Sequence, residues 1–295
     1  GGVGVRADER GLPDTRMNRV DFLLNLAGLL LWLEWRAVRL GAPLAAAGSI
    51  SAVLKHAKPR AARRWLYLAA LVALLGIRCV FYWRVGSRLD WVPSLDLGTI
   101  TLPFNSVSLG RMALYSVLSF GVVLAVFHLW LLLLSMVNRR VPDTDPWQRL
   151  VRQYLGWLEP WPVAVKLATP IFLVGALWWF AHAELVRQGM TAAPGSAAHL
   201  AQQSILVGLG TILAWKYLVI GLLFLGLLNT YLYLGSWSVW AFVQTTSRNL
   251  LRPLHLIPLR LGRIDLLPAV GLGLAWLAFA YAEAGISHLF GRLPL

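Results

Sequence analysis

Long apolar stretches recur along the chain, and each approaches the length that a helix needs to cross a lipid bilayer. About 20 apolar residues span roughly 30 Å of hydrocarbon at 1.5 Å per residue. The six stretches are Val20–Trp35, Trp65–Trp83, Met112–Val137, Val163–Ala181, Trp215–Tyr233 and Leu266–Ala282. A helix satisfies its backbone polar groups internally, as lipid requires. The sequence therefore predicts an all-α, polytopic membrane protein with about six transmembrane helices.

The composition supports this class. Hydrophobic residues make up 58% of the chain and charged residues only 14%, whereas about a quarter of a soluble domain is charged. The formal net charge of +14 is concentrated in loops between the apolar stretches. Loops of this kind face anionic membrane lipid. We therefore expect the bilayer and its anionic phospholipid headgroups as partners, and no nucleic acid.

Positive charge alternates between successive loops, and this predicts the direction of threading. Three loops are rich in Lys and Arg, at residues 36–64, 138–166 and 247–263. The loops at residues 84–110 and 183–203 carry acids and bases in near balance. Because cytoplasmic loops of membrane proteins retain Lys and Arg, we expect a bacterial inner-membrane protein with both termini outside. If Val20–Trp35 only lay at the interface, five crossings would remain and the N-terminus would be inside.

The expected organisation has four parts. Residues 1–19 are interpreted as a disordered or non-native leader, with Met17 as a candidate initiator. Residues 20–110 form a two-span region with a basic inner loop and a short outer hairpin around Gly98. Residues 111–182 and 204–284 are interpreted as a tandem repeat of two-span units, each with a basic interfacial segment. An amphipathic interfacial helix is expected over residues 145–158.

The repeat rests on a pattern that recurs after about 100 residues. The first copy contains Arg149-Leu-Val-Arg152, Thr169-Pro170 and Trp178, and the second contains Asn249-Leu-Leu-Arg252, Leu267-Pro268 and Trp276. Two crossings per unit preserve orientation, so this would be a parallel repeat. Chance similarity between two apolar stretches is the competing explanation.

The segment from Asn249 to Pro268 is the most distinctive in the chain. Pro253 and Pro258 limit helix length, and Gly262 can supply a turn with positive φ. Asp265 could accept hydrogen bonds from the first N–H groups of the last span, with Pro268 in its first turn. We expect an interfacial or re-entrant hairpin on the inner face. Its basic residues would lie at phosphate depth, and they are Arg248, Arg252, Arg260 and Arg263.

This segment resembles the signature of the YggT (YlmG-like) family of small membrane proteins. The matching residues are Leu250, Leu251, Arg252, Pro253, Leu254, Ile257, Pro258, Gly262, Ile264, Asp265 and Pro268. The departures are His255 and Leu256 in a region of paired arginines, Arg263 in place of a glycine, and Leu267 in place of a serine. The resemblance covers the last third of the chain well and Met112–Ala181 only faintly.

The resemblance implies a non-catalytic assembly or organisation factor. Family members are linked to cytochrome maturation, envelope and nucleoid organisation, and osmotic tolerance, without a shared reaction. We therefore expect the inner-face arginines to bind anionic lipid and other membrane proteins. No catalytic residue follows from the resemblance.

Lys216 is the most informative single charge within the apolar stretches. Its neighbours Trp215 and Tyr217 favour a position at the outer interface, where lysine extends its charged end toward water. An intramembrane lysine would instead mark an ion pair or a pathway. The expected pairing partners are Glu184 or Asp21, which the threading places on the same side. The alternative function is accordingly an anion or small-solute channel or transporter with Lys216 on its pathway.

The sequence contains no recognisable enzyme motif. The single cysteine, Cys79, excludes an intrachain disulfide and a thiolate zinc cluster. His128 and His182 would lie at different depths, so one haem cannot bridge them. We therefore expect no catalytic residue, no metal and no cofactor.

Overall fold

The computed structural model describes residues 11–40, 61–89, 91–98, 100–142, 145–232, 237–256, 260–261 and 264–291. For residues 11–16, 38–40, 61–63, 255–256, 260–261 and 264–265 it describes the backbone only. The chain divides into two compact units, and the division lies within one long helix. Unit 1 comprises Gly1–Asp96 and Thr101–Ala125, and unit 2 comprises Leu97–Ile100 and Val126–Leu295.

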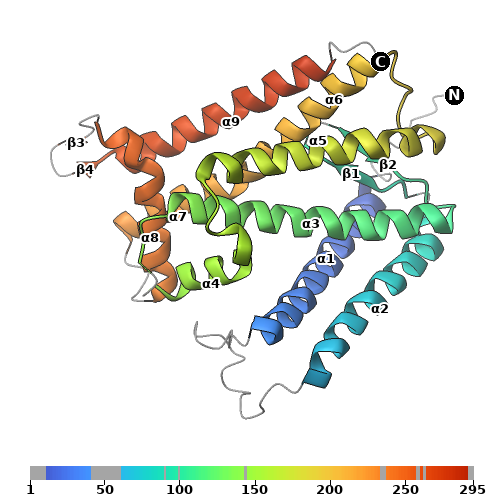
Figure 1. Cartoon of the computed structure of the whole chain (residues 1–295), viewed down its shortest axis with the longest axis horizontal. Coiled ribbons are helices and arrows are strands. Elements are labelled where there is room, and N and C mark those ends of the chain that lie inside the picture. The colour runs from blue at the N-terminus through green and yellow to red at the C-terminus, as the bar shows by residue number, and fades with distance from the viewer. Residues whose placement is uncertain are drawn as a thin grey trace, which may run out of the picture. The chain divides into compact units, whose positions relative to one another are not determined.

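Helices dominate both units (Figure 1). Within the described ranges, five helical stretches are long and apolar enough to cross a membrane. They are Arg64–Gly86 in α2, Leu109–Val137 (α3), Val163–Arg187 (α5), Ala197–Tyr231 and Leu267–Gly291 (α9). The prediction of an all-α polytopic membrane protein is confirmed. The chain is an integral membrane protein by the length and composition of these helices.

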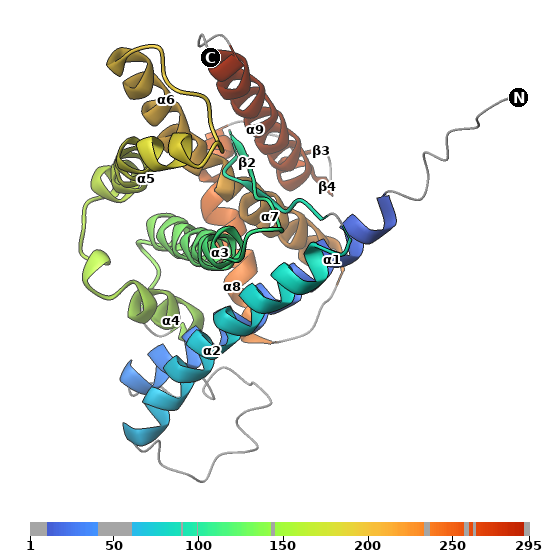
Figure 2. The ribbon, with the colours of Figure 1, turned by 90° about the vertical axis from the view of Figure 1, so that its right-hand side faces the viewer.

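The first helix, α1 (Gly11–Leu40), lies alongside α2 (Ala61–Gly86), as Figure 2 shows. The two run antiparallel, because Gly28 faces Leu71 and the guanidinium of Arg64 lies 5.4 Å from the ring of Trp35. Charged residues interrupt α1, so it is less apolar than the other long helices. In the described part of the chain, α1 is not among the five stretches that are long and apolar enough to cross a membrane, so a sixth crossing stays a prediction.

The start of α1 corrects one prediction. Residues 1–19 were expected to be a disordered or non-native leader, and residues 11–19 are helical instead of disordered, because α1 begins at Gly11. Met17 is buried, with 4% of its surface exposed. Packing of this side chain extends the helix beyond the apolar stretch that was visible in the sequence.

The predicted outer hairpin is present in the connection between α2 and α3. Strands β1 (Ser94–Asp96) and β2 (Thr101–Pro103) pair antiparallel, with Leu95 opposite Leu102. Both leucines are buried, while their neighbours in the strands are exposed. Gly98, in the turn, has a φ of 84°. Glycine adopts this conformation easily, whereas a residue with a side chain would be strained there.

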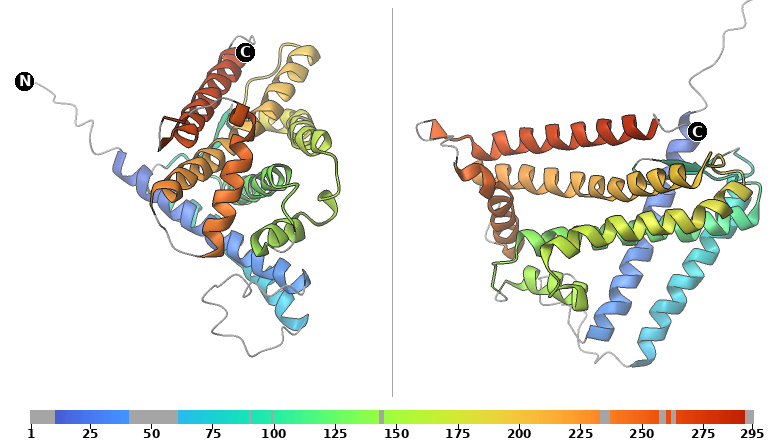
Figure 3. Two further views of the ribbon diagram at one scale, coloured as in Figure 1. Left: turned by 90° about the vertical axis from the view of Figure 1, so that its left-hand side faces the viewer. Right: turned by 45° about the horizontal axis from the view of Figure 1, so that its top comes forward.

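In unit 2, α5 and α6 (Ala197–Gly210) approach each other closely at glycines. A Cβ on Gly175 would lie 2.8 Å from the carbonyl oxygen of Ser204, and one on Gly208 would meet the carbonyl oxygen of Ile171. Helix α6 continues through a short 3-10 turn, Thr211–Ala214, into α7 (Trp215–Tyr231). The predicted fifth span is therefore the C-terminal half of a longer helix. In Figure 3, α5, the continuous helix α6–α7 and α9 lie side by side.

Two short amphipathic helices accompany the long ones in unit 2. Helix α4 (Pro146–Leu155), followed by the 3-10 turn Gly156–Leu158, confirms the amphipathic helix expected over residues 145–158, and its place at the membrane interface stays a prediction. Helix α8 (Ser238–Leu251), followed by a 3-10 turn at Arg252–Leu256, was not predicted. Figure 1 shows α8 crossing the ends of α7 and α9 at a steep angle.

The order of helices is the same in the two proposed repeat units, and the second unit also contains a short β-hairpin before its last helix. Helices α3, α4 and α5 follow one another as long, short and long, and so do α7, α8 and α9. A 3-10 turn lies between the short helix and the second long helix in both. The duplication itself stays a prediction.

Candidate functional site

Exposed arginines gather at one end of unit 2, where the two short helices lie. They occupy the turn after α3, the polar side of α4, the last turn of α8 and the turn that follows it. This basic face is defined by Arg139, Arg140, Arg149, Arg248 and Arg252. A steeply crossing helix with one buried and one basic side is typical of an element that lies in a membrane interface.

The position of α8 depends on polar contacts with the end of α3. The side-chain amide of Asn138 donates to Thr246 Oγ1 at 2.8 Å, and that of Asn249 donates to Asn138 Oδ1 at 2.9 Å. Asn138 and Thr246 are almost completely buried. These bonds turn the side of α8 that carries Thr246 inward, so Arg248 remains exposed.

Small residues allow α8 to lie close to the long helices. A Cβ on Gly226 of α7 would collide with Ser247, and one on Gly271 of α9 would collide with Leu251. The apolar side of α8 buries Phe242, Val243 and Leu251. The short helix is therefore fixed across the ends of both α7 and α9.

The acidic side chains that the structure describes at this end are used internally. Asp145 accepts hydrogen bonds from the backbone N–H groups of Trp147 and Gln148, and so caps α4. Glu159 accepts from Ser135 Oγ at 2.6 Å and lies 3.3 Å from Lys166 Nζ. Lys166 also donates to Ser135 Oγ at 2.7 Å and is buried. The outward charge of the face is therefore positive.

The structure places some of the predicted motif residues and leaves others open. Arg248, Arg252 and Pro253 are exposed, and Pro268 is in the first turn of α9. Strands β3 (Arg260–Leu261) and β4 (Ile264–Asp265) form a short hairpin in which Arg260 is opposite Asp265. A hairpin was expected in this segment. Pro258, Gly262 and Arg263 lie outside the described residues, and capping of α9 by Asp265 stays a prediction.

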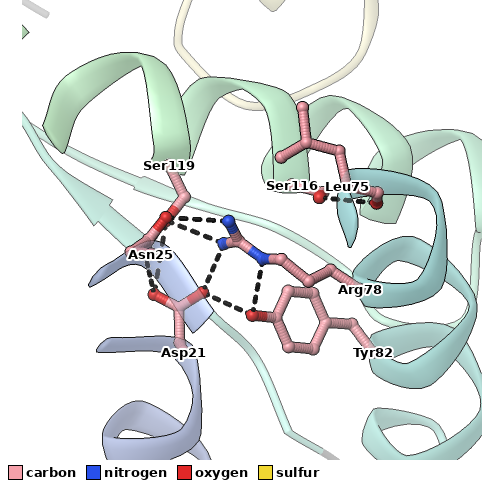
Figure 4. A network of polar contacts seen from close by, with 7 residues as sticks. All are labelled: Asp21, Asn25, Leu75, Arg78, Tyr82, Ser116 and Ser119. Atoms are coloured by element: carbon pink, nitrogen blue, oxygen red, sulfur yellow. Dashed lines mark hydrogen bonds and ion pairs between the residues drawn. The ribbon is translucent and has the colours of Figure 1, made fainter. Parts of the chain in front are cut away.

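A second polar site, in unit 1, was missed by the sequence reasoning. Arg78 of α2 is completely buried, and its Nη2 lies 2.9 Å from Asp21 Oδ1 of α1 (Figure 4). The guanidinium also donates to Asn25 Oδ1 at 2.8 Å and to the Tyr82 hydroxyl at 3.1 Å. All three guanidinium nitrogens therefore have acceptors.

Both oxygens of the Asp21 carboxylate also accept hydrogen bonds. Oδ1 accepts from the hydroxyl of Tyr82 at 2.7 Å, and Oδ2 accepts from Asn25 at 3.0 Å and from Ser119 of α3 at 3.3 Å. A buried ion pair is tolerated when its remaining lone pairs and protons are hydrogen-bonded. This network joins α1, α2 and α3, and its closed hydrogen bonding indicates a structural role.

An aromatic cluster adjoins the network. The ring of Tyr82 lies 5.4 Å from Trp91 and 5.8 Å from Tyr115, and Tyr115 lies 5.3 Å from Phe104. Trp91 and Phe104 flank the outer hairpin and are buried. The hairpin thus contributes apolar surface beside the ion pair, where low polarity strengthens the electrostatic attraction.

Lys216 has a different partner from the two that were expected. Its Nζ lies 2.5 Å from Glu283 Oε2 of α9, whereas Glu184 pairs with Arg187 and Asp21 pairs with Arg78. The sequence could not show that α9 lies against α7, which brings Glu283 to Lys216. The carboxylate of Glu283 balances the positive charge of Lys216. Lys216 is therefore not the unpaired cation that an anion pathway would need.

Comparisons of the chain with protein families, with curated proteins and with solved structures give no match. The part of the chain that the structure describes contains no group of three or more His, Cys, Asp or Glu side chains that could hold a metal ion. The basic face is therefore the candidate functional site on its own geometry.

Proposed function

We propose that this chain is a non-catalytic organisation factor of the YggT type in the bacterial inner membrane. Its basic face binds anionic phospholipid headgroups and holds membrane-protein partners at the inner surface. Phosphate groups are the natural ligands of arginine, whose guanidinium can donate two parallel hydrogen bonds.

One observation carries the proposal. The acidic side chains described beside the basic face are engaged in a helix cap and in a buried network, while Arg248 and Arg252 are exposed. Arginines on a short helix at the interface can reach phosphate groups without leaving the protein surface. Such contacts gain about 1 kcal/mol per basic residue near an anionic surface.

The experiment measures lipid that remains bound after purification in mild detergent. Replacing Arg248 and Arg252 together by Glu reverses two charges on the basic face. We expect the double variant to lose most of the phosphatidylglycerol and cardiolipin that the unmodified protein retains, as counted by mass spectrometry of the intact complex.

The control variant is Arg187→Glu, which reverses an exposed arginine at the opposite end of unit 2. It should retain lipid like the unmodified protein, and both variants should show the same helix content by circular dichroism. Equal retention by the Arg248/Arg252 variant and the unmodified protein would contradict the proposal.

A further inference from the structure

The Lys216–Glu283 pair lies far from the basic face, within two of the helical stretches that are long and apolar enough to cross a membrane. Helix α8 marks the inner interface, and three neighbouring helices give the distance from it. At 1.5 Å per residue, Lys216 is about 15 Å along α7 from Gly226, which contacts α8. Glu283 is about 18 Å along α9 from Gly271, which also contacts α8.

The third helix agrees. The indole N–H of Trp130 on α3 donates to Ala214 O at 2.8 Å, and that of Trp215 donates to Leu129 O at 2.9 Å. Trp130 is about 12 Å along α3 from Asn138, which holds α8. Because the hydrocarbon is about 30 Å thick, a pair about 12 to 18 Å from α8 lies inside it. This differs from the outer interface that the neighbouring aromatic residues suggested.

The pair is not enclosed by its own chain. The side chain of Glu283 is 48% exposed and that of Lys216 is 22% exposed. Charged groups at this depth are costly against lipid and normally face protein or a water-filled cavity. Whatever covers the pair must therefore offer polar or charged groups at the same depth.

The surface of α9 beside Glu283 permits close approach of another helix. At helical spacing, the small residues Gly273, Ala280, Ala284 and Ser287 lie on the same side as Glu283, and the exposed Trp276 lies there two turns before it. Nothing lies within 4 Å of a Cβ built on Gly273. Small residues at such positions let transmembrane helices pack backbone to backbone.

We propose that this α9 face is the interface of a homodimer. A twofold axis along the membrane normal brings the two copies of the pair together at one depth. Each Glu283 then faces the Lys216 of the other copy as well as its own, in a closed arrangement of four alternating charges. The second copy thus supplies the covering polar groups, and the small residues let it approach.

Cross-linking in native membranes tests the dimer. In a Cys79→Ser background, Ser287→Cys places a thiol one turn beyond Glu283 on the proposed interface. Leu289→Cys is the control, because Leu289 is 54% exposed and lies on the opposite side of the same helix. Under mild oxidation we expect disulfide-linked dimers at least tenfold more abundant for Ser287→Cys than for Leu289→Cys.

The charges themselves are tested in the same assay. Adding Glu283→Lys puts four positive charges at the interface and should abolish the Ser287→Cys dimer, while the swap Lys216→Glu with Glu283→Lys should restore it. Monomer only, a cross-link to a different protein, or equal cross-linking at both cysteines would overturn the proposal. None of these outcomes depends on lipid binding by the basic face.

Discussion

At the scale of single residues, charged side chains on the long helices form ion pairs with charges on neighbouring helices. Arg78 and Asp21 come from neighbouring helices and form an ion pair. Tyr82 and Asn25 satisfy the remaining hydrogen-bonding groups of the two side chains. Such a pair adds little net stability over well-packed apolar residues, but breaking it leaves a buried charge without a partner. The network therefore makes α1 and α2 depend on each other.

Arg78→Met is expected to lower the free energy of unfolding by about 3–5 kcal/mol, the range found when one partner of a buried pair is removed. Unfolding by denaturant in detergent, followed by circular dichroism, measures the change. Asp21→Leu combined with Arg78→Met removes both charges and should be less destabilising than Arg78→Met alone. Arg187→Met is the control, since Arg187 is 76% exposed, and it should change little. If Arg78→Met were as stable as this control, the structural role of the pair would be refuted.

The sequence identified most residues of the basic face but not the buried pair. Runs of arginine between apolar stretches are visible without knowing which helices touch. Arg78 and Asp21 both lie within predicted apolar stretches, yet their contact depends on the antiparallel register of α1 and α2. The usable signal was that each lies close to the same predicted end of its span, Asp21 one residue after Val20 and Arg78 five residues before Trp83, so similar depths could have been expected.

At the scale of elements, close packing of α5 on α6 depends on glycine. A side chain at residue 208 would meet the backbone of Ile171, which cannot move as a flexible side chain could. Gly208→Val is therefore expected to separate the two helices and lower the melting temperature by several degrees or more. Gly221→Val is the matched control, because nothing lies within 4 Å of a Cβ at that position. Similar melting temperatures for the two variants would show that α5 and α6 do not pack in this way.

Helix α8 provides a second test at this scale. Asn138→Leu removes the amide that holds Thr246 and Asn249, and leaving buried polar groups unpaired costs about 1–3 kcal/mol. We expect faster backbone hydrogen exchange in α8 with little change in α5. Asn229→Leu, which removes a bond to Gln244 that is only partly buried, should have a smaller effect. Unchanged exchange in α8 would show that Asn138 does not fix it.

The missed helix and the extended one have physical explanations. Helix α8 is short and amphipathic, so a search for apolar runs counts its basic end as loop. Helix α6–α7 is longer than a bilayer needs, and the sequence showed its excess only as further apolar residues. The position of α8 depends on Asn138, and that of α6 depends on α5. These contacts join segments that are far apart in the sequence, so the sequence does not reveal them.

At the scale of the whole molecule, the account rests on how the helices thread the membrane. The alternation of apolar and basic segments was sufficient to predict the class and the long helices. Direction is a separate claim, because it depends on which side keeps the arginines. If the basic face lies on the cytoplasmic side, its arginines meet the leaflet whose anionic lipids attract polybasic surfaces.

Labelling of single cysteines in intact bacterial cells tests this claim most directly. In a Cys79→Ser background, a membrane-impermeant maleimide should label Ala193→Cys, in the exposed loop between α5 and α6, without further treatment. Arg252→Cys should be labelled only after the cells are permeabilised. Labelling of Arg252→Cys in intact cells would place the basic face outside and contradict the account.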